Sequence, residues 1–332
     1  MSLELVIFVV AVALAFDFMN GFHDAANSIA TVVSTRVLPP RAGVLWAAFF
    51  NFLAAFGFGV SVASTIGQGI IITEIVTEWL ILSALAGAIA WDVITWWLGL
   101  PTSSSHALVG GLVGAGVVAR GWNVVHVQGV TTIALFIVLS PLIGMLVAFG
   151  MILVTSRIAR KFSRPSTDRA FRRFQLISAA LYSLGHGTND AQKTMGIIAV
   201  LLFTKGLIGP VFFVPFYVIL MAHAAIALGT YFGGWRIIRT MGMKLTKLAP
   251  FGGFSAETAA ASTLFLTANL GIPVSTTHTI AGAIIGVGAT RRLSAVRWGI
   301  ARRIVWAWIL TIPATAAISA ATYYTLKLVL LH

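Results

Sequence analysis

The chain has 332 residues, of which 58% are hydrophobic and 9% are charged, and its mean hydropathy is +0.96. Soluble globular domains carry about 25% charged residues, so this composition excludes an ordinary soluble protein and predicts an integral membrane protein. The net charge of +13 does not indicate a nucleic acid partner, because the basic residues lie in short clusters between apolar runs, a pattern that orients membrane helices.

The first half of the chain predicts helices that cross the membrane, because its apolar runs are long enough to span a hydrocarbon core of about 30 Å. The expected segments are, in order, a helix over 3–33 broken at 21–27, a crossing over 42–72, a paired run over 79–100 and 107–119, and a crossing over 130–155. The sequence leaves open whether the paired run spans the membrane twice or forms a re-entrant hairpin.

A hydrophilic segment at 157–173 divides the chain, because it holds seven basic residues and a single acid, Asp168. We expect a first transmembrane repeat over 1–156, a basic cytoplasmic linker over 157–173 and a second transmembrane repeat over 174–332. The expected segments of the second half are a helix from 174 that is broken at the polar stretch 187–193, a crossing over 211–235, a paired run over 259–272 and 279–289, and a last crossing.

Two motifs occur twice in the same order. The stretch GFHDAAN at 21–27 returns as GTNDAQK at 187–193, which lies 166 residues later. The joint PTSSSH at 101–106 returns as PVSTTH at 273–278, which lies 172 residues later, and glycines follow both joints at matching positions. Two motifs repeated at nearly the same offset predict a transporter built from two repeats, with its site at the repeat interface.

The charges of the loops predict how the repeats face. With the linker 157–173 in the cytoplasm, the acidic loop 73–78 falls outside and the basic segments 236–247 and 291–303 fall inside. Matching loops then lie on opposite faces, so we expect an all-α membrane protein with inverted repeats, broken helices and paired helical segments. We expect the protein to lie in the lipid bilayer of the cell membrane, with both termini outside the cytoplasm. Assembly as a homodimer is an open alternative.

Acidic residues at membrane depth are the first candidates for a coupling-ion site. An ionised carboxylate at a helix centre costs roughly 2.5–3.5 kcal/mol, which a bound Na⁺ or a proton would offset. Asp24 and Asp190 occupy matching positions in the two repeats, and Glu257 lies among small residues that let another backbone approach. Asp17 and Asp92 are interpreted either as further ligands or as buried hydrogen-bond partners.

The two repeated motifs differ in charge at their last position, where the first has Asn27 and the second has Lys193. Asn27 lies three residues after Asp24, so both face the same side of a helix, and its amide can serve a cation or an anion. Lys193 could replace a coupling cation, neutralise Asp190 or contact an anionic substrate. A lysine whose ammonium reaches the membrane surface is the structural alternative.

The hydroxyl clusters at 103–105 and 275–277 precede glycine-rich helices. Free N–H groups at a helix N-terminus, together with hydroxyl donors, form a site for an oxyanion. Each cluster alone could be an ordinary helix cap, but the repeated pattern favours substrate binding. His106 and His278 follow the clusters, and they either position the hydroxyls, relay protons or make structural hydrogen bonds.

No catalytic motif of a hydrolase or an ATP-driven pump occurs, and the absence of cysteine excludes thiol chemistry. We therefore expect a protein that is not an enzyme and that needs no cofactor besides its coupling ion.

The stretches 21–28, 187–193 and 273–278 resemble the signatures of the PiT inorganic phosphate transporter family, and the resemblance covers nearly the whole chain. It implies a symporter of inorganic phosphate driven by Na⁺ or H⁺, with phosphate at the membrane midplane. The residues that it implies are Asp24, Asn27, Asn189 and Asp190 for ion and phosphate, Ser104, Ser105, Thr276 and Thr277 for the oxyanion, and Glu257 for Na⁺.

Two departures from the family pattern bear on coupling. Sodium-coupled members carry Asn at the position of Lys193, whereas the pair Gln192 and Lys193 is similar to bacterial members coupled to protons or to metal phosphate. The chain also lacks the long central loop of eukaryotic members, which implies a compact bacterial type.

We expect phosphate import by alternating access with proton coupling favoured over Na⁺. Lys193 is then a phosphate ligand or a fixed cation, Gln192 is a supporting residue, and Na⁺ at Asp24, Asp190 and Glu257 is the alternative. The alternative substrate is sulfate, which would make the protein a sulfate permease of the same family. An anion channel would use basic clusters and hydroxyl rings but has little need for paired buried acids.

Overall fold

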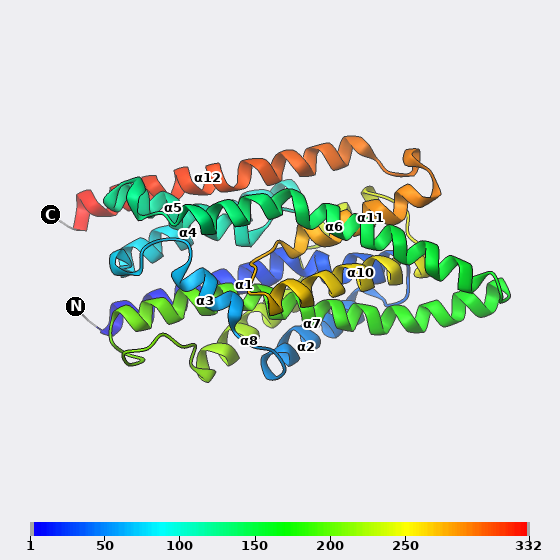
Figure 1. The fold of residues 1–332 in the computed structure, drawn as a ribbon, viewed down its shortest axis with the longest axis horizontal. Coiled ribbons are helices and arrows are strands. Elements are labelled where there is room, and N and C mark those ends of the chain that lie inside the picture. The colour runs from blue at the N-terminus through cyan, green and yellow to red at the C-terminus, as the bar shows by residue number, and fades with distance from the viewer. Residues whose placement is uncertain (1–2, 331–332) are drawn as a thin grey trace.

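The computed structural model describes residues 3–330 and shows a bundle of helices (Figure 1). Within these residues the one strand-like feature is an isolated antiparallel bridge between Ile71 and Val125. The α-helices are α1 (Leu3–Ser34), α2 (Pro40–Leu53), α3 (Ser61–Gln68), α4 (Glu78–Leu98), α5 (Ser104–Arg120), α6 (Val127–Ala159), α7 (Arg164–Thr204), α8 (Phe216–Phe232), α9 (Trp235–Arg239), α10 (Pro250–Asn269), α11 (Thr276–Arg291) and α12 (Trp298–Leu330). A π-helical segment, Thr240–Lys244, continues α9.

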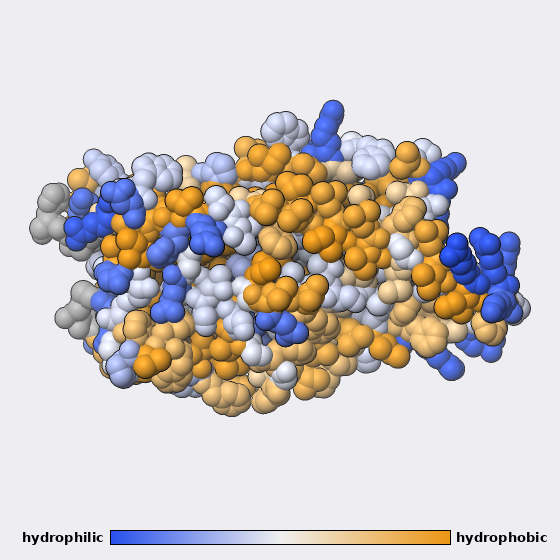
Figure 2. All heavy atoms as spheres, in the orientation of Figure 1, coloured by the Kyte–Doolittle hydropathy of each residue, from blue (hydrophilic) through white to orange (hydrophobic). Residues whose placement is uncertain are grey.

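Within residues 3–330 four helices, namely α1, α4, α6 and α12, are long and apolar enough to cross a membrane, and the number rises to six if each of two bent pairs is one span. The bend is 84° between α2 and α3, and 62° between α8 and the segment formed by α9 and the π-helix. Figure 2 shows apolar residues over the middle of the molecule and a hydrophilic group at the turn between α6 and α7. These features confirm the prediction of an all-helical membrane protein.

The helix breaks predicted at 21–27 and 187–193 are wrong, because α1 and α7 run without interruption through both stretches. The glycines serve close packing instead. A Cβ built on Gly21 would overlap the carbonyl of Ile226, and one built on Gly187 would lie 2.7 Å from the carbonyl oxygen of Asn51. The bends of the chain lie in other places, after α2 and after α8.

The basic segment 157–173 is mostly helical rather than a loop. Helix α6 continues to Ala159, and α7 already begins at Arg164, with a proline in its first turn that a helix start tolerates. The change of direction is confined to residues 160–163. The division of the chain into two repeats and a linker stays a prediction.

Both paired runs are hairpins that return to the end from which they start. Beside α4 and α5, the N–H of Ile72 donates to the carbonyl of Val124 at 2.9 Å. Beside α10 and α11, the N–H of Arg297 donates to the carbonyl of Leu245 at 3.0 Å. In Figure 1 the hairpin of α4 and α5 opens toward the end where α1 begins, and that of α10 and α11 opens toward the turn between α6 and α7.

The two halves run in opposite directions and exchange their last helices. Helix α1 begins and α12 ends at one end of the molecule, while α7 starts from the other end (Figure 1). Helix α6 packs on α11 of the other half, and α12 packs on α5. A Cβ on Gly282 or on Gly114 would overlap the backbone of the exchanged helix, at Pro141 and Ala316 respectively. This symmetry supports the inference of inverted repeats.

Candidate functional site

The repeated motifs meet the second hairpin joint at the centre of the molecule. Asp24 and Asn27 face it from α1, and the carboxylate of Asp24 accepts a hydrogen bond from the hydroxyl of Thr277 at 3.1 Å. The amide of Asn27 donates to the same hydroxyl at 2.8 Å. From α7, Asp190 accepts a hydrogen bond from Thr276 at 2.7 Å. One buried network therefore joins both motifs to the start of α11.

Lys193 links this network to the first hairpin joint. Its ammonium is buried, with 1% of the residue exposed, so the alternative of a side chain that reaches the membrane surface is excluded. The ammonium contacts the carboxylate of Asp190 and the hydroxyl of Ser105, and it donates to the carbonyl of Val274 at 3.0 Å. A fixed positive charge thus lies among an acid, a hydroxyl and a helix N-terminus, where it compensates the charge of Asp190.

Each hydroxyl cluster contains one helix cap and further hydroxyls that face the site. Ser103 accepts the backbone N–H of His106 at 3.3 Å, and Ser275 accepts that of His278 at 3.1 Å, as helix N-caps do. Among residues 3–330, the hydroxyl of Ser104 is buried without a hydrogen-bond partner. In the first cluster the hydroxyl that caps α5, that of Ser103, is therefore distinct from the buried hydroxyl of Ser104.

The two joints touch through their histidines. The ring centroids of His106 and His278 lie 4.8 Å apart, and His278 stacks on Trp308 at 3.9 Å. The indole N–H of Trp308 donates to the carbonyl of Pro101 at 2.9 Å. The histidine pair therefore holds the tips of the two hairpins against each other.

Glu257 forms a separate cluster. Its carboxylate accepts hydrogen bonds from the amide of Gln175, at 3.0 Å, and from the hydroxyl of Ser178. In the described part of the chain it shares no hydrogen bond with Asp24 or Asp190. The structure therefore places this acid beside the central network rather than within it.

Asn189 and Gln192 tie helices together. The amide of Asn189 donates to the carbonyls of Gly185 and Leu264, at 2.9 and 3.1 Å. The side-chain oxygen of Gln192 accepts the backbone N–H of Val62 at 2.9 Å, which caps the first turn of α3 from a helix far away in the sequence. These contacts give both residues a positioning role.

Two histidines that the sequence did not single out complete the centre. His23 lies 2.7 Å from the carboxylate of Asp24, and His186 lies 3.2 Å from that of Asp190. One ligand atom each of Asp24, His186 and Asp190 lie within 4.8 Å of one another, which is close enough for a single cation to bridge them. The spacing of four residues between His186 and Asp190 on one helix face was a signal for this pairing.

The phosphate transporter family has a sequence model that matches residues 20–319. A probable low-affinity inorganic phosphate transporter of Rhizobium meliloti (strain 1021) is 58% identical over 329 residues, covering 99% of this chain and 98% of the relative. A protein with the same description in Bacillus subtilis (strain 168) is 42% identical and covers 98% of each chain. A solved structure described as the sodium-dependent phosphate transporter is 30% identical, with a TM-score of 0.89 over 99% of this chain and 100% of that chain.

These likenesses extend over both hairpins and both repeated motifs, and they confirm both the resemblance to this family and the prediction of a transporter rather than an enzyme. The chain belongs to the phosphate transporter family.

Proposed function

We propose that this protein is a secondary active symporter that imports inorganic phosphate together with protons. The relatives described as inorganic phosphate transporters support the substrate. The observation that supports coupling to protons is the buried ammonium of Lys193, which contacts Asp190 and occupies the position that matches Asn27 in the first motif. A protein-borne cation at this place removes one reason for binding Na⁺ there.

The donors of the central network fit a phosphate ion. The ammonium of Lys193, the amide of Asn27 and the hydroxyls of three joint residues, Ser105, Thr276 and Thr277, converge within one buried cluster. Charged and hydroxyl donors in a dry site bind an oxyanion strongly because no water competes with them. Ser104, His106 and His278 belong to the same joints and are proposed to support this site.

Uptake of labelled phosphate into proteoliposomes tests the coupling. We expect accumulation under an inward proton gradient without Na⁺, and an excess of sulfate should not reduce it. Uptake that requires a Na⁺ gradient would contradict proton coupling and would instead assign Na⁺ to Asp24, Asp190 and Glu257. Strong competition by sulfate would favour an oxyanion permease of broader substrate range, and flux without accumulation would indicate a channel.

A metal phosphate complex is a second candidate substrate. The cluster of Asp24, His186 and Asp190 favours it, because two carboxylates and an imidazole suit a divalent cation that arrives with the phosphate. If a radioactively labelled divalent cation and phosphate are taken up in equal amounts, the transported species is the metal phosphate complex.

A further inference from the structure

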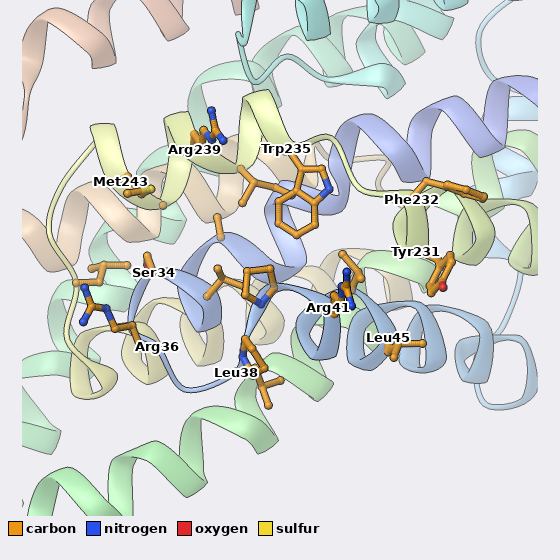
Figure 3. A pocket seen from close by; sticks show the side chains of 18 of the residues that line it. Ser34, Arg36, Leu38, Arg41, Leu45, Tyr231, Phe232, Trp235, Arg239 and Met243 are labelled. Atoms are coloured by element: carbon orange, nitrogen blue, oxygen red, sulfur yellow. The ribbon is translucent and has the colours of Figure 1, made fainter.

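A large cavity among the described residues lies apart from the candidate site. Its volume is about 1330 Å³, and its walls come from the end of α1, the start of α2, the end of α8, and α9 with the π-helical segment (Figure 3). Neither α7 nor either hairpin joint contributes a lining residue. Arg172, near the start of α7, donates to the carbonyl of Arg36 at 2.6 Å, so the cavity lies at the same end as the turn between α6 and α7.

The cavity carries a strong positive charge. Its described lining includes four cationic side chains, from Arg36, Arg41, Arg239 and Lys247, and no acid. None of the four forms an ion pair with any residue in the range 3–330. Such a set of uncompensated cations attracts a ligand with an anionic headgroup.

The opposite end of the cavity is apolar and faces outward. Figure 3 shows Arg36 at one end, Tyr231, Phe232 and Leu45 at the other, and Arg41 between them. Phe232 is 59% exposed and Leu45 is 56% exposed. On a membrane-spanning bundle, exposed apolar side chains beside aromatic residues meet acyl chains at the edge of the bilayer.

We propose that this cavity binds one anionic phospholipid. Its headgroup phosphate lies beside Arg41, in a positive field to which Arg36, Arg239 and Lys247 contribute, and its acyl chains lie along Leu45 and Phe232. Inorganic phosphate would meet the same cations, but it is far smaller than a cavity of about 1330 Å³ and makes no use of the apolar wall. A basic pocket between membrane helices is a recognised type of site for acidic lipid headgroups.

A lipid at this place connects parts of the bundle that do not follow each other in the chain. The cavity lies between the turn after α1 and helix α9. Helix α1 carries Asn27, and α9 follows the 62° bend after α8. The lipid therefore fixes the position of α9 relative to α1. This inference does not depend on which ion or anion the central site transports.

The test measures quenching of tryptophan fluorescence by phosphatidylglycerol with brominated acyl chains, added to the purified full-length protein in phosphatidylcholine nanodiscs. Trp235 lines the cavity and reports on an occupied site. We expect saturable quenching that brominated phosphatidylcholine does not reproduce and that Trp235→Phe reduces. In the double variant Arg41→Gln/Arg239→Gln, the lipid concentration that gives half-maximal quenching should rise by at least roughly tenfold.

The matched control is Arg302→Gln/Arg303→Gln, which removes two exposed cations of α12 that do not line the cavity and should leave the titration unchanged. Arg41→Lys/Arg239→Lys keeps the charge and should retain binding, which separates loss of charge from misfolding. Equal quenching by both lipids, or equal loss in the control variant, would overturn the proposal. Displacement of the brominated lipid by inorganic phosphate would reassign the cavity to the substrate.

Discussion

A lysine buried in a membrane protein is stable only beside an acid, and Asp190 provides that acid for Lys193. If the ammonium takes the place of a coupling cation, Lys193→Asn should create a requirement for Na⁺. We expect phosphate uptake by this variant to rise at least about tenfold on addition of Na⁺, the effect of roughly 1.4 kcal/mol of differential binding. Uptake that stays independent of Na⁺ would contradict the proposed role of the ammonium.

The control for Lys193→Asn is Lys193→Met, which removes the ammonium charge without adding a side chain that could bind a cation. Lys193→Met leaves Asp190 buried without the ammonium that compensates its charge, which costs roughly 3–5 kcal/mol of stability, whereas Lys193→Met/Asp190→Asn removes both charges and should recover most of it. Thermal unfolding in detergent measures both variants. Recovered folding without recovered transport separates the structural role of this pair from its role in coupling.

At the scale of elements, the glycines of the repeated motifs set the distance between helices. Gly21→Ala should push α1 away from the carbonyl of Ile226 on α8 and destabilise the protein by roughly 1–3 kcal/mol. Gly150→Ala on α6 is the matched control, because a Cβ there meets no atom within 4 Å. It should be neutral or stabilise the helix by up to about 1 kcal/mol. Equal midpoints of thermal unfolding for the two variants would show that the close approach is not required.

The predicted break of α1 at this place rested on the usual preference of glycine for turns. A glycine inside a helix costs roughly 0.5–1 kcal/mol relative to alanine, and contact between two helix backbones offsets that cost. Close contacts at Gly21 and Gly187 are made with segments distant in the sequence, at Ile226 and Asn51. Local composition therefore could not distinguish a packed glycine from a break.

At the scale of the whole molecule, the direction of the bundle in the membrane follows from its charged end. The turn between α6 and α7 carries the hydrophilic group seen in Figure 2, and basic loops face the cytoplasm in most membrane proteins. We therefore expect Ser166 on the cytoplasmic side and Asn123 on the opposite side; both are exposed.

Because the chain has no cysteine, single substitutions report on this orientation directly. A membrane-impermeant maleimide applied to intact cells should label Asn123→Cys and not Ser166→Cys, and inside-out vesicles should give the reverse pattern. Labelling of both from one side would contradict the placement of these two ends of α6 on opposite sides of the membrane.

The sequence by itself determined the helical membrane class, the paired helical runs, the repeated acids and the hydroxyl joints, because hydropathy, proline position and motif repetition are properties of neighbouring residues. Only the tertiary structure decided that Lys193 meets Asp190 and Ser105, that Glu257 binds Gln175 in a separate cluster, and that Gln192 caps α3. Except for the short step from Asp190 to Lys193, these contacts join residues 82 to 130 positions apart. Long-range packing brings such polar groups together in a dry interior, where each buried donor or acceptor needs a partner that no local pattern specifies.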